Sequence, residues 1–302
     1  MEIIDRVDTK EMMQSFKEIE NQNENICTVI LKVDNQAFNI NKKSYELKLF
    51  GKTMTEWVAN AVYDTQICYA NYNFNDDFLP IVKNATNSNS KYTVVLFSDT
   101  PLFQHKTFLE IMEYFKIKGL SVLKFTRGYV FETNYLMQID SLLNPQFQYF
   151  EEEDFITCLN LKQTAMVEEV LKNRILSYFM KKGVIIEDPS STFIDADCQI
   201  EAGTIIKPFN QIRGNSIIEA NALIDSNCFI ENSVVLSNAT IKSSKISNSL
   251  ICKNVTINEN CVISNNAKIC DEVALPPFIN VDGVVINKDA NLNSFCTYKA
   301  KD

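Results

Sequence analysis

The chain has 302 residues, a formal net charge of -9 and a pI near 4.9, which allows one large or two modest domains. We expect two domains. The acidic charge argues against a nucleic-acid partner, because phosphate binding through counterion release needs a basic face. No apolar run is long enough to cross a bilayer and no charged-then-apolar leader is present, so we expect a soluble cytoplasmic protein with no membrane partner.

The first half of the chain alternates predicted strands and helices. A buried strand is predicted over 91–97, a helix over 106–118 that stops at Gly119, and further strands over 120–125 and 129–131. Alternation of this kind is typical of an α/β domain with a mainly parallel sheet.

A long helix is predicted over 161–182, where apolar residues recur at helical spacing. Lys181 and Lys182 favour the end of a helix, and Gly183 can terminate it. We therefore expect a reduced α/β domain over 1–160, a linker helix over 161–183 and a further domain over 184–302.

The last third carries a six-residue repeat of aliphatic residues. They are Ile194, Ile200, Ile206, Ile212, Ile218, Ile224, Ile230 and Leu236. Six is neither the period of a helix nor the alternation of a two-sided strand. It fits a left-handed parallel β-helix, a triangular prism in which three hexads make one turn and each aliphatic side chain points to the axis.

A second register supports the prism. Four places after an aliphatic position the corner needs a small residue, and the sequence supplies Cys198, Thr204, Ser216, Ala222 and Cys228. After Leu236 the predicted step shortens to five, through Ile241, Ile246 and Ile251, and then returns to six. A last partial coil with Ile286 and Leu292 is expected beyond an interruption at Pro276-Pro277.

The corners of the prism are predicted to use asparagine in place of glycine. Only seven glycines occur, well below average usage of about 7%. Asparagine tolerates left-handed backbone angles, and it recurs at Asn215, Asn221, Asn227, Asn232, Asn238, Asn248, Asn260 and Asn266.

Nine cysteines and one histidine do not form a metal or disulfide pattern. No CxxC pair is present, so we expect reduced and mostly buried thiols. The single histidine, His105, is expected to be an exposed surface residue.

The order of α/β domain, helix and prism resembles the bacterial bifunctional N-acetylglucosamine-1-phosphate uridyltransferase and glucosamine-1-phosphate acetyltransferase family, which includes a UDP-N-acetylglucosamine pyrophosphorylase activity. The similarity is strongest over 171–206, across the passage from linker helix into β-helix, including Asp188-Pro189 and Ile194-Asp195. Weaker matches occur at 51–62 (GKTMTEWVANAV), 96–103 (LFSDTPLF) and 128–132 (GYVFE).

The resemblance implies a metal site and a ligand contact in the first domain. Asp99 stands where the family's metal-binding aspartate ends a strand, and Asn160 matches its second magnesium ligand, with Lys162 in place of an arginine as a ligand-binding residue. Oxygen ligands of this kind suit Mg²⁺ that is shared with a phosphate. A strand-end aspartate and a helix-capping asparagine without metal explain the same two residues equally well.

Other parts of the family's machinery are missing. Its glycine-rich phosphate loop needs residues without a Cβ, and no glycine precedes Gly51. Its acetyl transfer uses a histidine base inside the β-helix, whereas His105 lies in the α/β half.

We therefore hypothesise a nucleotidyltransferase-like protein that binds a sugar phosphate or nucleotide sugar with impaired or absent uridyltransfer and no acetyl transfer. Two alternatives stay open: an active sugar-phosphate nucleotidyltransferase with an atypical phosphate loop, and a structural or regulatory assembly protein. In each case a homotrimer formed through the prism is expected.

Overall fold

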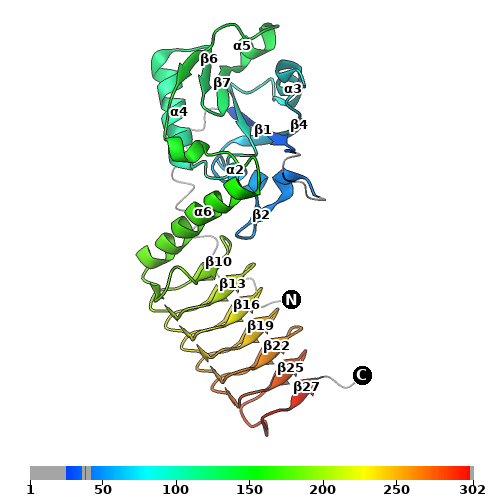
Figure 1. Ribbon diagram of the computed structural model, residues 1–302, viewed down its shortest axis with the longest axis vertical. Coiled ribbons are helices and arrows are strands. Elements are labelled where there is room, and N and C mark those ends of the chain that lie inside the picture. The colour runs from blue at the N-terminus through cyan, green and yellow to red at the C-terminus, as the bar shows by residue number, and fades with distance from the viewer. Residues whose placement is uncertain (1–24, 36–37, 39–41, 300–302) are drawn as a thin grey trace. The chain divides into compact units, whose positions relative to one another are not determined.

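The computed structural model describes residues 25–35, 38 and 42–299. They form two compact units, and each is described by itself. The first unit contains the described residues up to Leu47 together with Thr53–Thr164. The second contains Lys48–Lys52 and the described residues from Ala165 onward. Figure 1 shows the elements of both units.

The first unit is built on a six-stranded sheet in the order β4-β1-β5-β7-β6-β8. Its strands in chain order are β1 (Ile26–Val33), β4 (Gln66–Tyr72), β5 (Tyr92–Phe97), β6 (Val122–Phe125), β7 (Gly128–Glu132) and β8 (Gln146–Gln148). All neighbouring pairs are parallel except the two that involve β7. The predicted α/β domain with a mainly parallel sheet is confirmed.

Helices cover both faces of this sheet. They are α2 (Met54–Asn60), α3 (Phe78–Ala85), α4 (His105–Lys118) and α5 (Thr133–Gln138). Alternate strand residues point to opposite faces, so Ile30 packs with Phe108 of α4 on one side, and Leu31 packs with Leu79 of α3 on the other. Helix α4 ends at Gly119 in the left-handed region, as predicted.

The second unit begins in the predicted linker helix, α6 (Leu161–Lys181), of which the part from Ala165 belongs to it. Gly183 follows the helix with a φ of 91°, a conformation that favours glycine. The chain then enters the β-helix.

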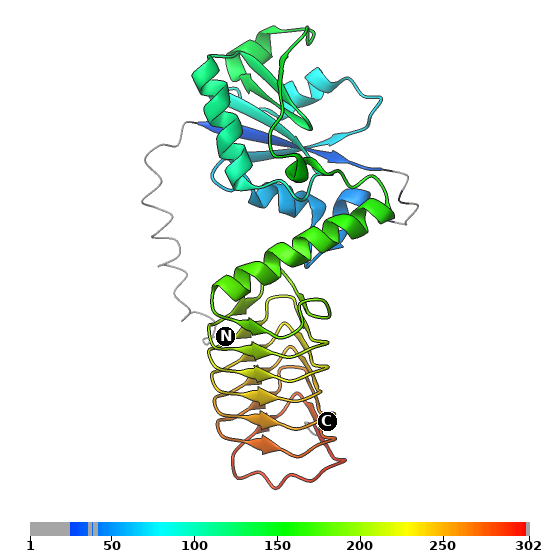
Figure 2. The ribbon, with the colours of Figure 1, turned by 60° about the vertical axis from the view of Figure 1, so that its left-hand side comes forward.

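The β-helix has three walls, each a parallel sheet of short strands stacked one above another (Figure 2). One wall contains β10 (Phe193–Ile194), β13 (Gln211–Arg213), β16 (Phe229–Glu231), β19 (Lys245–Ser247), β22 (Val262–Ser264), β25 (Asn280–Asp282) and β27 (Thr297–Lys299). The second contains β11 (Gln199–Ile200), β14 (Ile217–Ile218), β17 (Val234–Val235), β20 (Leu250–Ile251), β23 (Lys268–Ile269) and β26 (Val285–Ile286). The third contains β9 (Ile185–Ile186), β12 (Ile205–Ile206), β15 (Leu223–Ile224), β18 (Thr240–Ile241), β21 (Thr256–Ile257) and β24 (Ala274–Leu275). The predicted left-handed parallel β-helix of hexapeptide repeats is confirmed as the fold of this region.

The axial stack follows the predicted aliphatic positions with one correction. The side chains from Ile194 to Ile230 are buried at every sixth residue, and the small corner residues before them are buried too. The next inward residue is Val235, which pairs with Ile218 and Ile251 and is fully buried. The prediction of Leu236 as an axial residue is wrong, because the first five-residue step runs from Ile230 to Val235.

The end of the repeat also differs from the prediction. Pro276-Pro277 does not interrupt the coil, because Leu275 and Val281 are both fully buried and six residues apart. Ile286 lies inside the last coil as expected. Leu292 is half-buried and belongs to no strand, so it does not continue the stack.

The predicted asparagine corners are confirmed at seven of the eight positions. Left-handed φ values between 47° and 62° occur at Asn221, Asn227, Asn232, Asn238, Asn248, Asn260 and Asn266. Asn215 is the exception, because the preceding Gly214 takes the left-handed conformation with a φ of 63°.

Candidate functional site

The carboxyl ends of β1 and β5 define the edge of the sheet where an open α/β domain binds ligands. The chain passes from β1 to its neighbour β4 on one side, and then to β5 on the other side. Parallel sheets place ligand sites at such a reversal, outside the carboxyl ends of the strands. The two strand ends are joined there by a hydrogen bond of 3.0 Å, donated by the Val33 amide to Ser98 Oγ. We call this region the strand-end edge, formed by Val33, Ser98, Asp99 and Arg127.

Asp99 lies at this edge and its carboxylate is engaged by an arginine. The residue is 3% exposed. Arg127 Nε donates to Asp99 Oδ1 over 3.1 Å, and Arg127 Nη2 donates to Asp99 Oδ2 over 2.6 Å. A bidentate pair of this type is both strong and directional. Both carboxylate oxygens therefore have a cationic partner within the protein.

Arg127 is itself held by aromatic rings. Its guanidinium carbon lies 4.2 Å from the ring centre of Phe97, at the end of β5, and 5.5 Å from that of Phe74. Arginine is favoured over aromatic faces because the ring quadrupole attracts the cation. The side chain keeps 22% of its surface exposed.

Asn160 lies at the start of α6 and acts as its cap. Asn160 Oδ1 accepts from the Gln163 amide over 3.0 Å, and Asn160 Nδ2 donates to Gln163 Oε1 over 3.1 Å. The segment is brought to the strand-end edge by a hydrogen bond of 2.8 Å from the Cys158 amide to the Asp99 carbonyl. Lys162 is exposed on the first turn of α6.

These positions bear on a possible Mg²⁺ site. Asp99 and Asn160 offer oxygen ligands in one unit, but the carboxylate is paired with Arg127 and the amide oxygen caps a helix. Within the described ranges, no group of three or more His, Cys, Asp or Glu side chains could hold a metal ion. The role of both residues as Mg²⁺ ligands therefore stays a prediction, and a bound ion would have to take the place of Arg127.

Arg127 is the residue at this edge that sequence reasoning missed. It lies in the tight turn between β6 and β7. Its only sequence signal is its place directly before 128–132, one of the segments that resemble the family. Because β7 pairs with β5, the turn that contains Arg127 lies beside Asp99.

The prediction of His105 as an exposed residue is wrong. Its side chain is 28% exposed, its Nδ1 lies 2.9 Å from the Ala61 carbonyl oxygen, and its ring lies 4.7 Å from that of Tyr63. The thiol prediction is confirmed for all nine cysteines, which are free, six of them buried and three half-buried. No helix in the described part of the chain is long and apolar enough to span a membrane.

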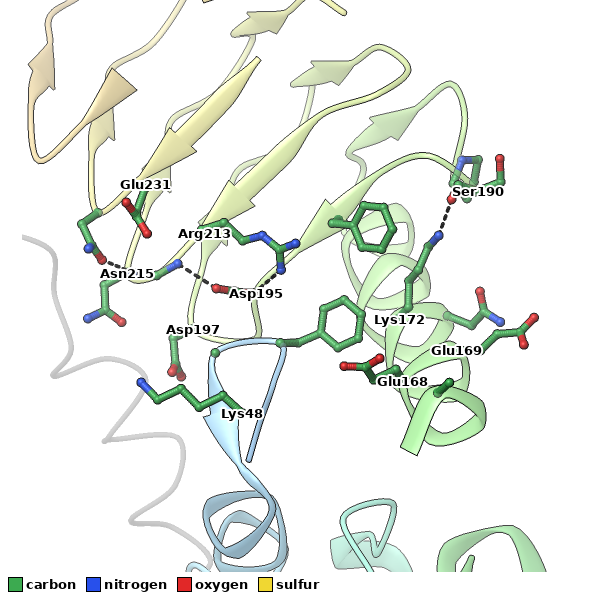
Figure 3. Close-up of a pocket in the computed structure, with 18 of the residues that line it drawn as sticks. Lys48, Glu168, Glu169, Lys172, Ser190, Asp195, Asp197, Arg213, Asn215 and Glu231 are labelled. Carbon is green, nitrogen blue, oxygen red and sulfur yellow. Dashed lines mark hydrogen bonds and ion pairs between the residues drawn. The ribbon is translucent and has the colours of Figure 1, made fainter. Parts of the chain in front are cut away.

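A second concave site lies within the unit that contains the β-helix (Figure 3). Its cavity volume is about 1390 Å³, and its lining comes from α6, from the first coils of the β-helix and from the segment Lys48–Lys52. At its centre Arg213 Nη1 donates to Asp195 Oδ1 over 3.0 Å. The sequence analysis noted Asp195 only as part of the family resemblance and did not predict a site here.

The chain thus combines an α/β domain with a hexapeptide β-helix. Residues 189–300 match the family model described as the GMPPB C-terminal domain.

Similar curated proteins carry the name bifunctional protein GlmU. One from Desulfitobacterium hafniense is 43% identical over 54 residues, which is 18% of this chain and 12% of that protein. One from Syntrophomonas wolfei is 45% identical over 65 residues, 22% of this chain and 14% of that protein. One from Brevibacillus brevis is 33% identical over 72 residues, 24% of this chain and 16% of that protein.

The resemblance stated from the sequence is therefore confirmed over part of the chain, which is similar there to the GlmU proteins. Each match spans less than a fifth of the relative's own length.

Proposed function

We propose that this protein binds a sugar phosphate or nucleotide sugar at the strand-end edge of its α/β domain, with impaired or absent uridyltransfer. The observation that carries the proposal is the bidentate pair of Arg127 and Asp99. Metal-assisted transfer of a nucleotidyl group needs a carboxylate that is available to Mg²⁺. In the free protein this carboxylate is neutralised by Arg127, and the cost of displacing Arg127 would slow any metal-assisted transfer.

The same pair suits the binding of a phosphate. Guanidinium groups recognise phosphate oxygens through paired N–H donors, and Arg127 is partly exposed and braced by Phe97. We expect Mg²⁺ to enter only together with a phosphate ligand, because the ligand's charge then compensates Arg127 as it leaves Asp99. Asn160 would complete the protein ligands of the ion.

Acetyl transfer is not part of the proposed function. The family's transfer depends on a histidine base in the β-helix, and the single histidine of this chain is His105, at the start of α4. Incubation with acetyl-CoA and glucosamine 1-phosphate should give no acetylated product. Measurable turnover that is lost on a substitution within the β-helix would contradict this part of the proposal.

Calorimetric titration with UTP, UDP-N-acetylglucosamine and hexose phosphates, with and without Mg²⁺, tests ligand binding. We expect Mg²⁺-dependent binding of at least one of these, and a loss of about tenfold in Asp99→Ala, which corresponds to about 1.4 kcal/mol. Asp140→Asn is a matched control, because that side chain is fully exposed on the same unit. No binding by the parent protein, or unchanged binding by Asp99→Ala, would contradict the proposal.

The two alternatives give different results in the same preparation. An active nucleotidyltransferase would release pyrophosphate from UTP in the presence of a sugar phosphate, whereas the proposed binder would release it slowly or not at all. A structural or regulatory assembly protein would bind none of these ligands. One observation favours the assembly protein. On one wall of the β-helix, Ile217, Val234 and Leu250 form an outward apolar ladder on adjacent strands, which suits contact with another chain.

A further inference from the structure

The cavity of the β-helix unit has walls that are fixed in place. The segment Lys48–Lys52 is held against the first coil by a hydrogen bond of 3.0 Å from the Ala196 amide to the Phe50 carbonyl. Lys52 Nζ lies 2.5 Å from Asp197 Oδ1. Between them Gly51 adopts a φ of 86°, and a Cβ there would lie 3.3 Å from the Asp195 side chain. The tight turn thus closes one side of the cavity.

The central charges of the cavity are already paired. Asp195 accepts from Arg213 over 3.0 Å and from the Gly214 amide over 2.9 Å. On the α6 side, Lys172 donates to the Ser190 carbonyl (Figure 3). Lys172 Nζ also lies 4.4 Å from the ring centre of Phe193. These contacts hold Arg213 and Lys172 against the floor of the cavity, although Lys172 keeps its charge because its partners are a neutral carbonyl and an aromatic ring.

Three other carboxylates on the lining have no cationic side chain bonded to them. Among the residues that the structure describes, the side chains of Glu168, Glu169 and Glu231 make no hydrogen bond or ion pair. Glu168 is half-buried, and burial raises the pKa of its carboxyl group, an effect that the neighbouring Arg213 partly offsets. The lining carries six acidic side chains against three basic ones, which are Lys48, Lys172 and Arg213, so the cavity presents excess negative charge.

We propose that this cavity binds an extended organic cation, with ammonium or guanidinium groups placed at Glu168 and Glu231. The cavity volume of about 1390 Å³ exceeds the range of about 300–1,000 Å³ that is typical of small-molecule pockets, which leaves room for a ligand with several cationic groups. A ligand cation removes the cost of keeping Glu168 ionised in a half-buried place. The chemistry is shared by a Lys- or Arg-rich peptide of a partner protein and by a free polyamine.

Titration of the full-length chain separates these two sources. The probes are spermine and a tetralysine peptide, each measured at low ionic strength and at about 0.15 M salt. We expect one-to-one binding of at least one probe. Glu168→Gln and Glu231→Gln should each weaken it about fivefold or more, the scale of a partly exposed ion pair. Binding of the peptide alone assigns the site to a protein partner, and binding of spermine alone assigns it to a polyamine.

A charge-matched control distinguishes a site from general attraction to an acidic protein. Glu113 is exposed on α4 of the other unit, so Glu113→Gln removes the same charge without touching the cavity. Equal weakening by Glu113→Gln and Glu168→Gln, or no binding of either probe, would overturn the proposal. Both cavity variants keep the shape of the side chain, and a thermal melt equal to that of the parent confirms that they fold.

A second measurement reports on Glu168 directly. A cation placed beside a carboxyl group lowers its pKa, so binding near pH 5 should release protons in the parent and fewer in Glu168→Gln. Comparison of binding enthalpies in buffers of different ionisation enthalpy measures that release. Equal proton release by both proteins would show that the ligand does not bind beside Glu168. None of these readouts depends on Asp99, so the strand-end edge is tested separately.

Discussion

The register of the β-helix at Val235 can be tested by two neighbouring substitutions. Val235 is fully buried between Ile218 and Ile251 of the adjacent coils, whereas Leu236 is half-buried on the outside. In Val235→Asp the stack loses about 1.5–3 kcal/mol of apolar burial. An unpaired carboxyl group on the axis costs at least about 2 kcal/mol more. The sum is about 4 kcal/mol or greater.

Leu236→Asp should cost far less, about 1 kcal/mol, because its carboxylate remains in water. A change of 1 kcal/mol shifts Tm by about 2–4 °C in a domain of this size, so Val235→Asp should melt roughly 8–16 °C below the parent. Scanning calorimetry gives the Tm values, and hydrogen exchange over residues 217–251 shows that the β-helix is the part that opens. Ile218→Asp provides a reference for an axial carboxylate.

A lower Tm for Leu236→Asp than for Val235→Asp would refute the register described for the axial stack. Equal Tm values for Val235→Asp and the parent would also refute it. In either case the five-residue step would lie elsewhere, and the axial stack would have a different register from the one described.

Three further predictions follow from the contacts above. Arg127→Gln should lower the free energy of unfolding by about 3 kcal/mol, because it leaves the buried Asp99 carboxylate without its partner. Denaturant unfolding measures this loss, and a change near zero would show that the pair is not formed. Burial raises the pKa of Cys198 to about 12 and that of Cys228 to about 11, so neither thiol should be alkylated at pH 8 in the folded protein. Both thiols should react in denaturant, and mass spectrometry after iodoacetamide treatment measures the difference. The chain should form a homotrimer through the β-helix, and light scattering that gives a monomer mass at micromolar concentration would contradict it.

The sequence alone was sufficient for the architecture of the last third, for a physical reason. In a prism, each side chain's tertiary environment recurs at a fixed interval along the chain, so the burial pattern appears directly as a sequence period. The aliphatic series from Ile194 to Ile230, the small corner residues and the asparagine turns all follow from that local rule. Helix α4 could be predicted from the sequence for a similar reason, because Gly119 ends it and lies next to it in the chain.

Only the tertiary structure placed the step at Val235. The segment Val234-Val235-Leu236 has three aliphatic residues in a row, so any of them could face the axis by composition alone. The choice is made by the pairing of Val235 with Ile218 in the coil before it and Ile251 in the coil after it. That pairing depends on residues 16 to 17 positions away, which no local pattern reports.

The candidate sites were decided almost entirely by tertiary contacts. Asp99 was predicted from the family resemblance and from its place after a buried strand. Its partner Arg127 is 28 residues away and reaches it because β7 pairs with β5. The cavity beside Asp195 depends on the turn at Gly51, more than a hundred residues earlier in the chain. A sequence period records burial that repeats along the chain, whereas each of these contacts occurs once and joins distant segments, so only the folded structure could show them.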